Sequence, residues 1–416
     1  MILGRLHTFD AFTSRNFRFL WTAHAIFSAA FWLHFVVVGW LSYEISESPL
    51  ISALVLGIDA LPVLIGAPFG GLLSDKYNKK ILLTLTYCYL FIVLSCYSVV
   101  ILYGFAETWN VLLFVFLVGM SWIVIDPARM ALIASVSLRS NLQNAFSLDW
   151  LGFSLMRLIT PASGGLAIAI WGPGPIFVVC SLLMGSAAIF ISLVERDSDV
   201  ASRNIERPIG TVMGDLKSGI SQLTVNNLTV GITLISLILI LFTIPFVGGL
   251  APVYAKEIYN VGPEGLGLMM SSAGLGSVIG TFILATSGEI RKPGKILILL
   301  VICLLVLMVL LGINDNFFLS LAIFFCSSAC TFPFLSISSS TIQSVIPANY
   351  RGRVNGIYTS TWGIMPVGSL MSGLLADRYG VQVSTIFGAL IAFIWLMTGI
   401  RFFKQMWNNQ LDSDRE

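Results

Sequence analysis

Twelve apolar stretches follow one another through this chain of 416 residues, and polar breaks separate them. A helix that spans a lipid bilayer needs about 20 mostly apolar residues, because it rises about 1.5 Å per residue across a hydrocarbon core about 30 Å thick. We therefore expect an all-α membrane protein with twelve transmembrane helices. The expected spans are 17–43, 50–73, 80–104, 109–133, 143–170, 174–194, 227–254, 265–287, 295–313, 316–344, 354–376 and 381–403.

The composition excludes an ordinary soluble protein. Hydrophobic residues make up 56% of the chain and charged residues only 11%, whereas soluble domains carry about 25% charged residues. Residues 1–16 lack the short apolar core and the cleavage site of a signal peptide, so we expect the first span to stay in the membrane.

One polar segment, 195–226, is far longer than the other breaks and carries nine charges. It divides the spans six and six. We predict an N-terminal six-helix bundle over 1–194, a cytoplasmic linker over 195–226 and a C-terminal six-helix bundle over 227–416. This division is typical of transporters that are built from repeats.

The halves also share short sequences. LRSNLQNAF at 138–146 precedes the fifth span, and NYRGRVNGI at 349–357 precedes the eleventh. GLLADRYG at 373–380 restates GLLSDKYN at 71–78, although the two lie at opposite membrane faces in the predicted topology. An inverted repeat nested within each half explains this relationship, and convergence on a common turn is the alternative.

The lysines and arginines gather on one side of the predicted membrane. With the N-terminus in the cytoplasm, 19 of the 23 fall on the cytoplasmic side, while Lys256 and Arg378 face outward and Arg129 and Arg157 lie within spans. Because cytoplasmic loops carry the excess of positive charge, we predict a multi-pass protein of the cytoplasmic (inner) membrane with both termini in the cytoplasm.

No sequence pattern indicates enzymatic or cofactor chemistry. The six cysteines all fall inside apolar runs, without C-x-x-C pairs or zinc-ligand spacing. The chain also has no nucleotide-binding loop and no catalytic triad. We expect no metal, no cofactor, no nucleic-acid partner and no enzymatic activity, and ATP is not expected to power the protein directly.

Five ionisable residues lie well inside predicted spans: Asp59, Asp126, Arg129, Asp149 and Arg157. Each costs about 2.5–3.5 kcal/mol at the centre of a membrane helix unless it is paired or faces water. Asp126 and Arg129 are three residues apart and should pair on one helix face. We expect Asp149 and Arg157 to form a second pair, which leaves Asp59 without a permanent partner.

Asp59 is therefore the first candidate for proton coupling, because a lone intramembrane carboxylate can take up and release a proton. Asp126, Asp149, His24 and His34 are further candidates, and both histidines are expected on one face of the first span. The alternatives are hydrogen bonds between helices for Asp59 and the histidines. For Asp126 and Arg129 they are a structural ion pair, a gate or a contact with substrate.

A cavity for an amphipathic molecule needs aromatic walls and a few polar anchors. Helix packing and an interfacial belt are the alternative roles for such side chains. The candidate wall residues are Phe27, Phe31, Trp32, Trp122, Phe246, Tyr358 and Trp362.

The hairpin after the second span resembles the signature loop of the major facilitator superfamily, G-x-x-x-D-R/K-x-G-R/K-R/K. The matching residues are Gly71, Asp75, Lys76, Lys79 and Lys80, with Asn78 in place of the last glycine. Asparagine tolerates positive φ better than most residues, so we expect it to replace glycine there. The resemblance implies that Asp75 and its neighbours help to latch two helical bundles together on the cytoplasmic side.

The fifth span resembles the exporter signature G-P-x-x-G-G of the same superfamily, with Thr160, Pro161, Gly164 and Gly165 at the matching positions. Threonine stands where the signature has its first glycine. The resemblance favours export over import.

A closer resemblance covers nearly the whole chain, through NFRFLW at 16–21, IDPARMAL at 125–132 and RGRVNGIY at 351–358. These segments look like the third drug:proton antiporter group, which includes macrolide-efflux permeases and enterobactin-type siderophore exporters. The resemblance implies two bundles that rock about a central cavity under a proton gradient. Relatives commonly carry Gly-Asp-Trp where this chain has Ala30-Phe31-Trp32, so an acid is absent from the first span.

We therefore predict a secondary active transporter that exports small amphipathic molecules, drugs or siderophore-like metabolites, by proton antiport through alternating access. Its expected partners are a small-molecule substrate, protons and membrane lipids, and we expect a monomer. The alternatives are a lysolipid or nutrient importer of the same fold, and a membrane sensor or scaffold that does not transport.

Overall fold

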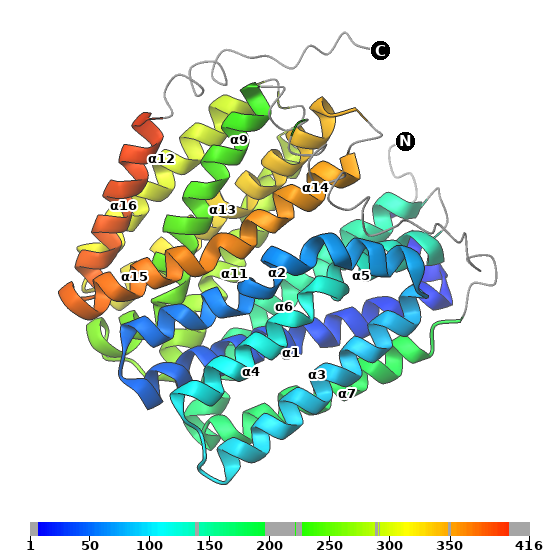
Figure 1. The fold of residues 1–416 in the computed structure, drawn as a ribbon, viewed down its shortest axis with the longest axis horizontal. Coiled ribbons are helices and arrows are strands. Elements are labelled where there is room, and N and C mark those ends of the chain that lie inside the picture. Colours follow the sequence, from blue (N-terminus) through cyan, green and yellow to red (C-terminus); the bar gives the residue numbers. More distant parts are fainter. Residues whose placement is uncertain are drawn as a thin grey trace, which may run out of the picture.

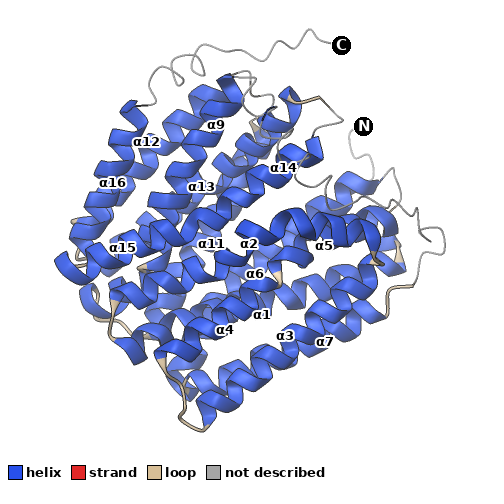
Figure 2. Ribbon diagram, viewed as in Figure 1, coloured by secondary structure: helices blue, strands red, loops and turns tan. Residues whose placement is uncertain are grey.

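The computed structural model describes residues 7–137, 141–195, 221, 227–287, 290, 292–347 and 351–398. Every regular element in these ranges is helical, and none of them contains a strand (Figure 2). Helices satisfy their own backbone hydrogen bonds, which lipid cannot do. The prediction of an all-α membrane protein is confirmed.

The described residues of the first half form a short 3-10 helix and seven α-helices. They are η1 (His7–Thr13), α1 (Arg15–Ser46), α2 (Pro49–Lys76), α3 (Lys79–Leu102), α4 (Thr108–Met120), α5 (Trp122–Val136), α6 (Leu142–Trp171) and α7 (Pro173–Ser192).

The second half contains α-helices, two π-helical segments (η4 and η5) and one 3-10 segment (η6). They are α9 (Asn227–Ile238), η4 (Leu239–Gly249), α10 (Ala251–Val253), η5 (Tyr254–Ile258), α11 (Pro263–Thr286), α12 (Pro293–Gly312), α13 (Phe317–Val345), α14 (Arg351–Ser360), η6 (Thr361–Ile364), α15 (Met365–Tyr379) and α16 (Val381–Thr398).

Eleven helical stretches of the described residues are long and apolar enough to cross a membrane. The predicted fourth span is one such stretch, although it divides into α4 and α5 at Ser121. The predicted span 354–376 folds as α14, η6 and α15 and is not among the eleven. Helix α14 at the start of this span is polar, and α15 at its end carries Asp377 and Arg378.

The two halves lie side by side along two seams. In Figure 1, α1–α7 occupy the lower right and α9–α16 the upper left, and α2 crosses the middle beside α14 and α15. The first seam joins α2 to α15 and η6, and the second joins α6 to α11. The predicted linker, 195–226, lies outside the described residues apart from Glu195 and residue 221, so the domain boundaries stay a prediction.

The ends of the bundle differ in charge. We call the end at which α1 begins the basic end, because Lys76, Lys79 and Lys80 of the α2–α3 hairpin lie there. We call the opposite end the acidic end. The acidic residues in or beside its connections are Glu44, Glu47, Glu107, Glu257, Glu264, Asp315 and Asp377.

Candidate functional site

A compact charged cluster lies inside the first half. Arg129 of α5 donates from Nη2 to Oδ1 of Asp126 at 2.9 Å and from Nη1 to Oδ2 of Asp149. His24 Nδ1 of α1 lies 2.9 Å from the other Asp149 oxygen. The side chains of Arg129 and Asp149 are 4% and 1% exposed, whereas Asp126 is 55% exposed. The predicted pair of Asp126 with Arg129 is confirmed, and its charge is shared with a second acid.

The predicted pair of Asp149 with Arg157 is wrong. The two residues are eight positions apart on α6, about 12 Å along the axis, and Arg129 of the neighbouring helix reaches Asp149 instead. The Arg157 guanidinium carbon lies 5.0 Å from the ring centre of Trp32 and 4.1 Å from that of Phe332. Within the described part of the chain, no carboxylate lies at ion-pair distance from Arg157.

Asp59 is the acid that lacks a cation, as the sequence predicts. Its Oδ1 is buried and has no hydrogen-bond partner among the described residues. The side chain of Trp122, at the start of α5, interacts with this carboxyl group. Helices α2 and α4 approach closely here, since a Cβ on Gly119 of α4 would lie 2.2 Å from the Asp59 carbonyl oxygen. Of the five ionisable residues well inside the predicted spans, Asp59 and Arg157 thus have no oppositely charged partner among the described residues.

Four of the predicted wall residues lie in one aromatic cluster. Phe31 is at its centre, with ring-centre distances of 4.9 Å to Trp122, 5.1 Å to Trp32 and 6.3 Å to Phe27. Phe153 of α6 joins the same cluster, 5.5 Å from Trp32. Phe153 was not predicted from the sequence, although it stands four residues from both Asp149 and Arg157 and therefore shares their helix face.

Both histidines of α1 are buried, His24 against α6 and His34 against Phe114 of α4. His24 stacks on Phe27 at 5.8 Å and on Phe153 at 6.0 Å. His34 has its Nδ1 3.2 Å from the carbonyl oxygen of Phe31, while its Nε2 is buried without a hydrogen-bond partner among the described residues. Only His24 therefore belongs to the charged cluster.

The other predicted wall residues lie in the second half. Phe246 is fully buried against Phe242, with a ring-centre distance of 6.4 Å, and against the backbone at Gly388. Its contacts are those of a packing residue. The hydroxyl of Tyr358 lies 3.0 Å from that of Ser236. Trp362 is half-buried in η6, the segment that packs against α2.

The exporter signature forms the seam between α6 and α11. A Cβ on Gly165 would lie 2.3 Å from the Pro263 carbonyl oxygen, and one on Gly267 would lie 2.3 Å from that of Pro161. Thr160, Pro161, Gly164 and Gly165 are all buried. Close backbone approach of this kind is how small residues join helices in a membrane.

The hairpin signature departs from one expectation. Asn78 has φ −65° and accepts a hydrogen bond from the Ile81 N–H at 3.3 Å, so it is the N-cap of α3. The expected use of positive φ at this position is wrong, because asparagine serves here as a capping residue. Lys76 is exposed, and Lys79 and Lys80 are half-buried. The side chains of Gly71 and Asp75 lie outside the described residues.

Contacts between the halves gather at the acidic end. Asp377 accepts hydrogen bonds from the Ser48 hydroxyl at 3.1 Å and from the Leu50 N–H at 3.2 Å. The Tyr43 hydroxyl donates to the carboxylate of Glu257. Each of these bonds joins α1, α2 or their connection to an element of the second half.

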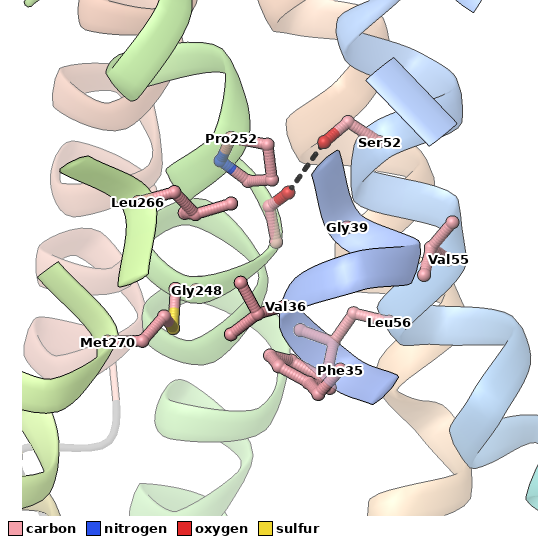
Figure 3. Close-up of a pocket in the computed structure, with 11 residues that line it drawn as sticks. Phe35, Val36, Gly39, Ser52, Val55, Leu56, Gly248, Pro252, Leu266 and Met270 are labelled. Atoms are coloured by element: carbon pink, nitrogen blue, oxygen red, sulfur yellow. Dashed lines mark hydrogen bonds between the residues drawn. The ribbon is translucent and has the colours of Figure 1, made fainter. Parts of the chain in front are cut away.

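A small apolar pocket lies next to these contacts (Figure 3). Its cavity volume of about 20 Å³ is room for about one water molecule. The Ser52 hydroxyl donates to the Gly249 carbonyl oxygen at 3.2 Å across it. The lining residues come from both halves: Phe35, Val36, Gly39, Ser52, Val55, Leu56, Gly248, Gly249, Pro252, Leu266 and Met270.

Comparison with known families decides the class of the protein. A family described as transmembrane secretion effectors, within the major facilitator superfamily, matches residues 6–415. The chain belongs to this family. The family match agrees with the signatures in the hairpin and in α6, and it makes the chain a multi-pass membrane transporter by fold and family.

Several characterised and uncharacterised transporters are similar over most of their length. An uncharacterised MFS-type transporter, YfiS of Bacillus subtilis, is 23% identical over 91% of each chain. Macrolide efflux protein A of Streptococcus pyogenes is 22% identical over 80% of this chain and 83% of its own. The staphyloferrin A transporter of Staphylococcus aureus is 22% identical over 84% of this chain and 87% of its own.

Solved structures of transporters share the fold. The crystal structure of the nucleoside transporter NupG covers 95% of this chain and 100% of its own, with a TM-score of 0.71 at 13% identity. At that identity the likeness shows only that the two proteins share a fold.

Proposed function

We propose that this family member exports small amphipathic organic molecules in exchange for protons. It would do so in the cytoplasmic membrane, with both termini in the cytoplasm, by alternating access between bundles 1–194 and 227–416. The efflux and siderophore transporters among its relatives support export. The excess of lysine and arginine at the basic end supports the orientation.

The observation that carries the proton coupling is the uncompensated carboxyl group of Asp59. Burying an ionised carboxylate without a counter-ion is costly by several kcal/mol, and a bound proton removes that cost. The group can therefore stay buried with a proton and release it when water reaches it. Asp149 is less suited to this task, because Arg129 and His24 both contact its carboxylate.

The helix that carries Asp59, α2, also forms a seam that alternating access has to open. Gly57, two residues earlier on α2, packs so closely on α15 that a Cβ there would lie 2.8 Å from the Cα of Pro366. Rocking of the halves about this seam would change the surroundings of Asp59. The state of the proton and the state of the transporter would then be linked, as antiport requires.

The experiment uses everted membrane vesicles from cells that express the protein, with an internal acid pH generated by respiration. The probes are erythromycin and anilinonaphthalene sulfonate, and the matched variants are Asp59→Asn and Asp315→Asn, the second changing an exposed acid. We expect the wild type to take up at least one probe, and a protonophore should abolish this uptake. The Asp59→Asn variant should show no uptake, whereas the Asp315→Asn variant should take up the probe as the wild type does. Protonophore-insensitive uptake by all variants, or no uptake of either probe, would refute the proposal.

A further inference from the structure

Arg157 is a cation in the middle of a predicted membrane span without a counter-ion in the described part of the chain. The nearest acid on its own helix, Asp149, is already held by Arg129 and His24. Asp59 lies beyond ion-pair distance in this conformation. A guanidinium that remains unpaired at a cost of about 2.5–3.5 kcal/mol points to a function in which a partner arrives.

The unsatisfied atoms around Arg157 indicate what that partner is. Nη1 of Arg157 and Nε1 of Trp32 are both buried without a hydrogen-bond partner among the described residues, and the two side chains are in contact. Both atoms are obligatory donors, because neither a guanidinium nor an indole nitrogen accepts a hydrogen bond. The missing group is therefore an acceptor, and the positive charge of Arg157 requires an anion.

The walls of the site indicate the rest of the molecule. Arg157 lies between the aromatic faces of Trp32 and Phe332, and Phe35 and Phe153 contact the Trp32 ring at 5.9 Å and 5.5 Å. Aromatic side chains bind flat apolar groups by stacking and by edge contacts. An aromatic ring next to an acid group matches this combination.

The site also joins the two halves. Trp32 belongs to α1 and Arg157 to α6, whereas Phe332 belongs to α13 of the second half. At the same level α11 packs closely on the backbone of α6. Pro161 cannot donate to the Arg157 carbonyl, and a Cβ on Gly274 of α11 would lie 2.6 Å from that oxygen. A ligand bound here would contact elements on both sides of the seam.

We propose that Arg157, Trp32 and Phe332 form the binding subsite for the acid group of an aromatic organic anion. The proposal rests on the proposed transport function and names its substrate class. The anion accepts hydrogen bonds from Arg157 Nη1 and Trp32 Nε1, and its ring packs among the aromatic side chains. Cationic amphipathic molecules are disfavoured, because they would face the charge of Arg157.

Binding to the purified full-length protein in detergent tests the subsite without any gradient. The probes share one ring system and differ in charge: naphthoate, naphthamide and naphthylmethyl-trimethylammonium. We expect saturable naphthoate binding by isothermal titration calorimetry, and affinity at least tenfold lower for the amide and the cation. A tenfold difference corresponds to about 1.4 kcal/mol.

Substitutions identify the residues. Arg157→Gln should lower naphthoate affinity at least tenfold and remove the preference over naphthamide, and Arg157→Lys should restore part of that preference. Arg378→Gln is the matched control, since Arg378 also lies over an aromatic ring, that of Tyr379 at 5.6 Å, but is exposed at the acidic end. It should bind naphthoate as the wild type does.

Phe332→Ala retains the charge and provides a second test. It should lower the affinity for naphthoate and naphthamide by a similar factor, because both lose the same aromatic contact. Wild-type protein that binds no naphthoate at millimolar concentration, or Arg157→Gln protein with unchanged charge preference, overturns the subsite. If naphthoate binding fails these tests while wild-type vesicles still exchange protons for erythromycin, the transport function stands and only the anion subsite falls.

Discussion

Asp377, near the end of α15, caps the first turn of α2 by accepting the Leu50 N–H at 3.2 Å. The carboxylate comes from the second half and the helix from the first, so this contact closes the protein at its acidic end. The segment that carries Asp377, GLLADRYG, is the one that restates GLLSDKYN at the end of α2. A carboxylate favours a helix N-terminus through the N–H groups and the helix dipole.

Asp377→Ala should therefore populate conformations that are open at the acidic end. Loss of an N-cap contact costs about 0.5–2 kcal/mol, which is about a 2- to 30-fold change in population. The readout is the spin-label distance between Tyr103 and Phe318, which are exposed at the acidic end of opposite halves, in a variant without native cysteines. The control Asp315→Ala loses only a bond from Gln382 within one half and should leave the distances unchanged. Equal distance distributions in both variants would exclude a latch.

The two buried arginines should respond oppositely to neutralisation. Arg129→Gln removes the main counter-ion of the buried Asp149 carboxylate. Breaking such a buried ion pair costs about 3–5 kcal/mol of stability. Arg157→Gln removes a charge that has no partner, so stability should stay the same or rise. Thermal unfolding in detergent gives the comparison. A larger loss of Tm in Arg157→Gln than in Arg129→Gln would show that Arg157 has a structural ion-pair partner.

Gly165→Ala should disrupt the seam between α6 and α11. Its Cβ would lie 2.3 Å from the Pro263 carbonyl oxygen, and overpacking of this kind costs about 1–3 kcal/mol. Gly248→Ala is the control, because nothing lies within 4 Å of the Cβ that it adds. We expect a lower Tm and slower vesicle uptake for Gly165→Ala only. A wild-type Tm for Gly165→Ala would mean that α6 and α11 can move apart without a loss of stability.

Much of this architecture follows from the sequence, because hydropathy is a property of each stretch by itself. The spans, and the isolation of Asp59 on α2, needed no knowledge of which helices are neighbours. The partner of Asp149 could not be predicted in that way, since Arg129 and His24 reach it from two other helices. Spacing along α6 favoured Arg157, and only the packing of α1 and α5 against α6 shows why Arg157 is left unpaired.

Asn78 illustrates a second limit. Because it replaces a glycine in a signature loop, a positive φ was expected for it. Its φ is instead −65°, and its side chain caps α3. The break at Ser121 is a third example. It lies two residues after Gly119, where α2 approaches closely, and no local pattern in the span indicates that approach.

The most direct test of the account is transport by purified protein in liposomes with an acidic lumen, with anilinonaphthalene sulfonate outside. The sulfonate stays ionised, so the pH gradient alone does not accumulate it. We predict that liposomes with the wild type accumulate the probe above its external concentration until a protonophore is added. In liposomes with the Asp59→Asn variant, the internal probe concentration should rise only to the external one. Accumulation by Asp59→Asn protein equal to that of the wild type would contradict proton coupling through Asp59.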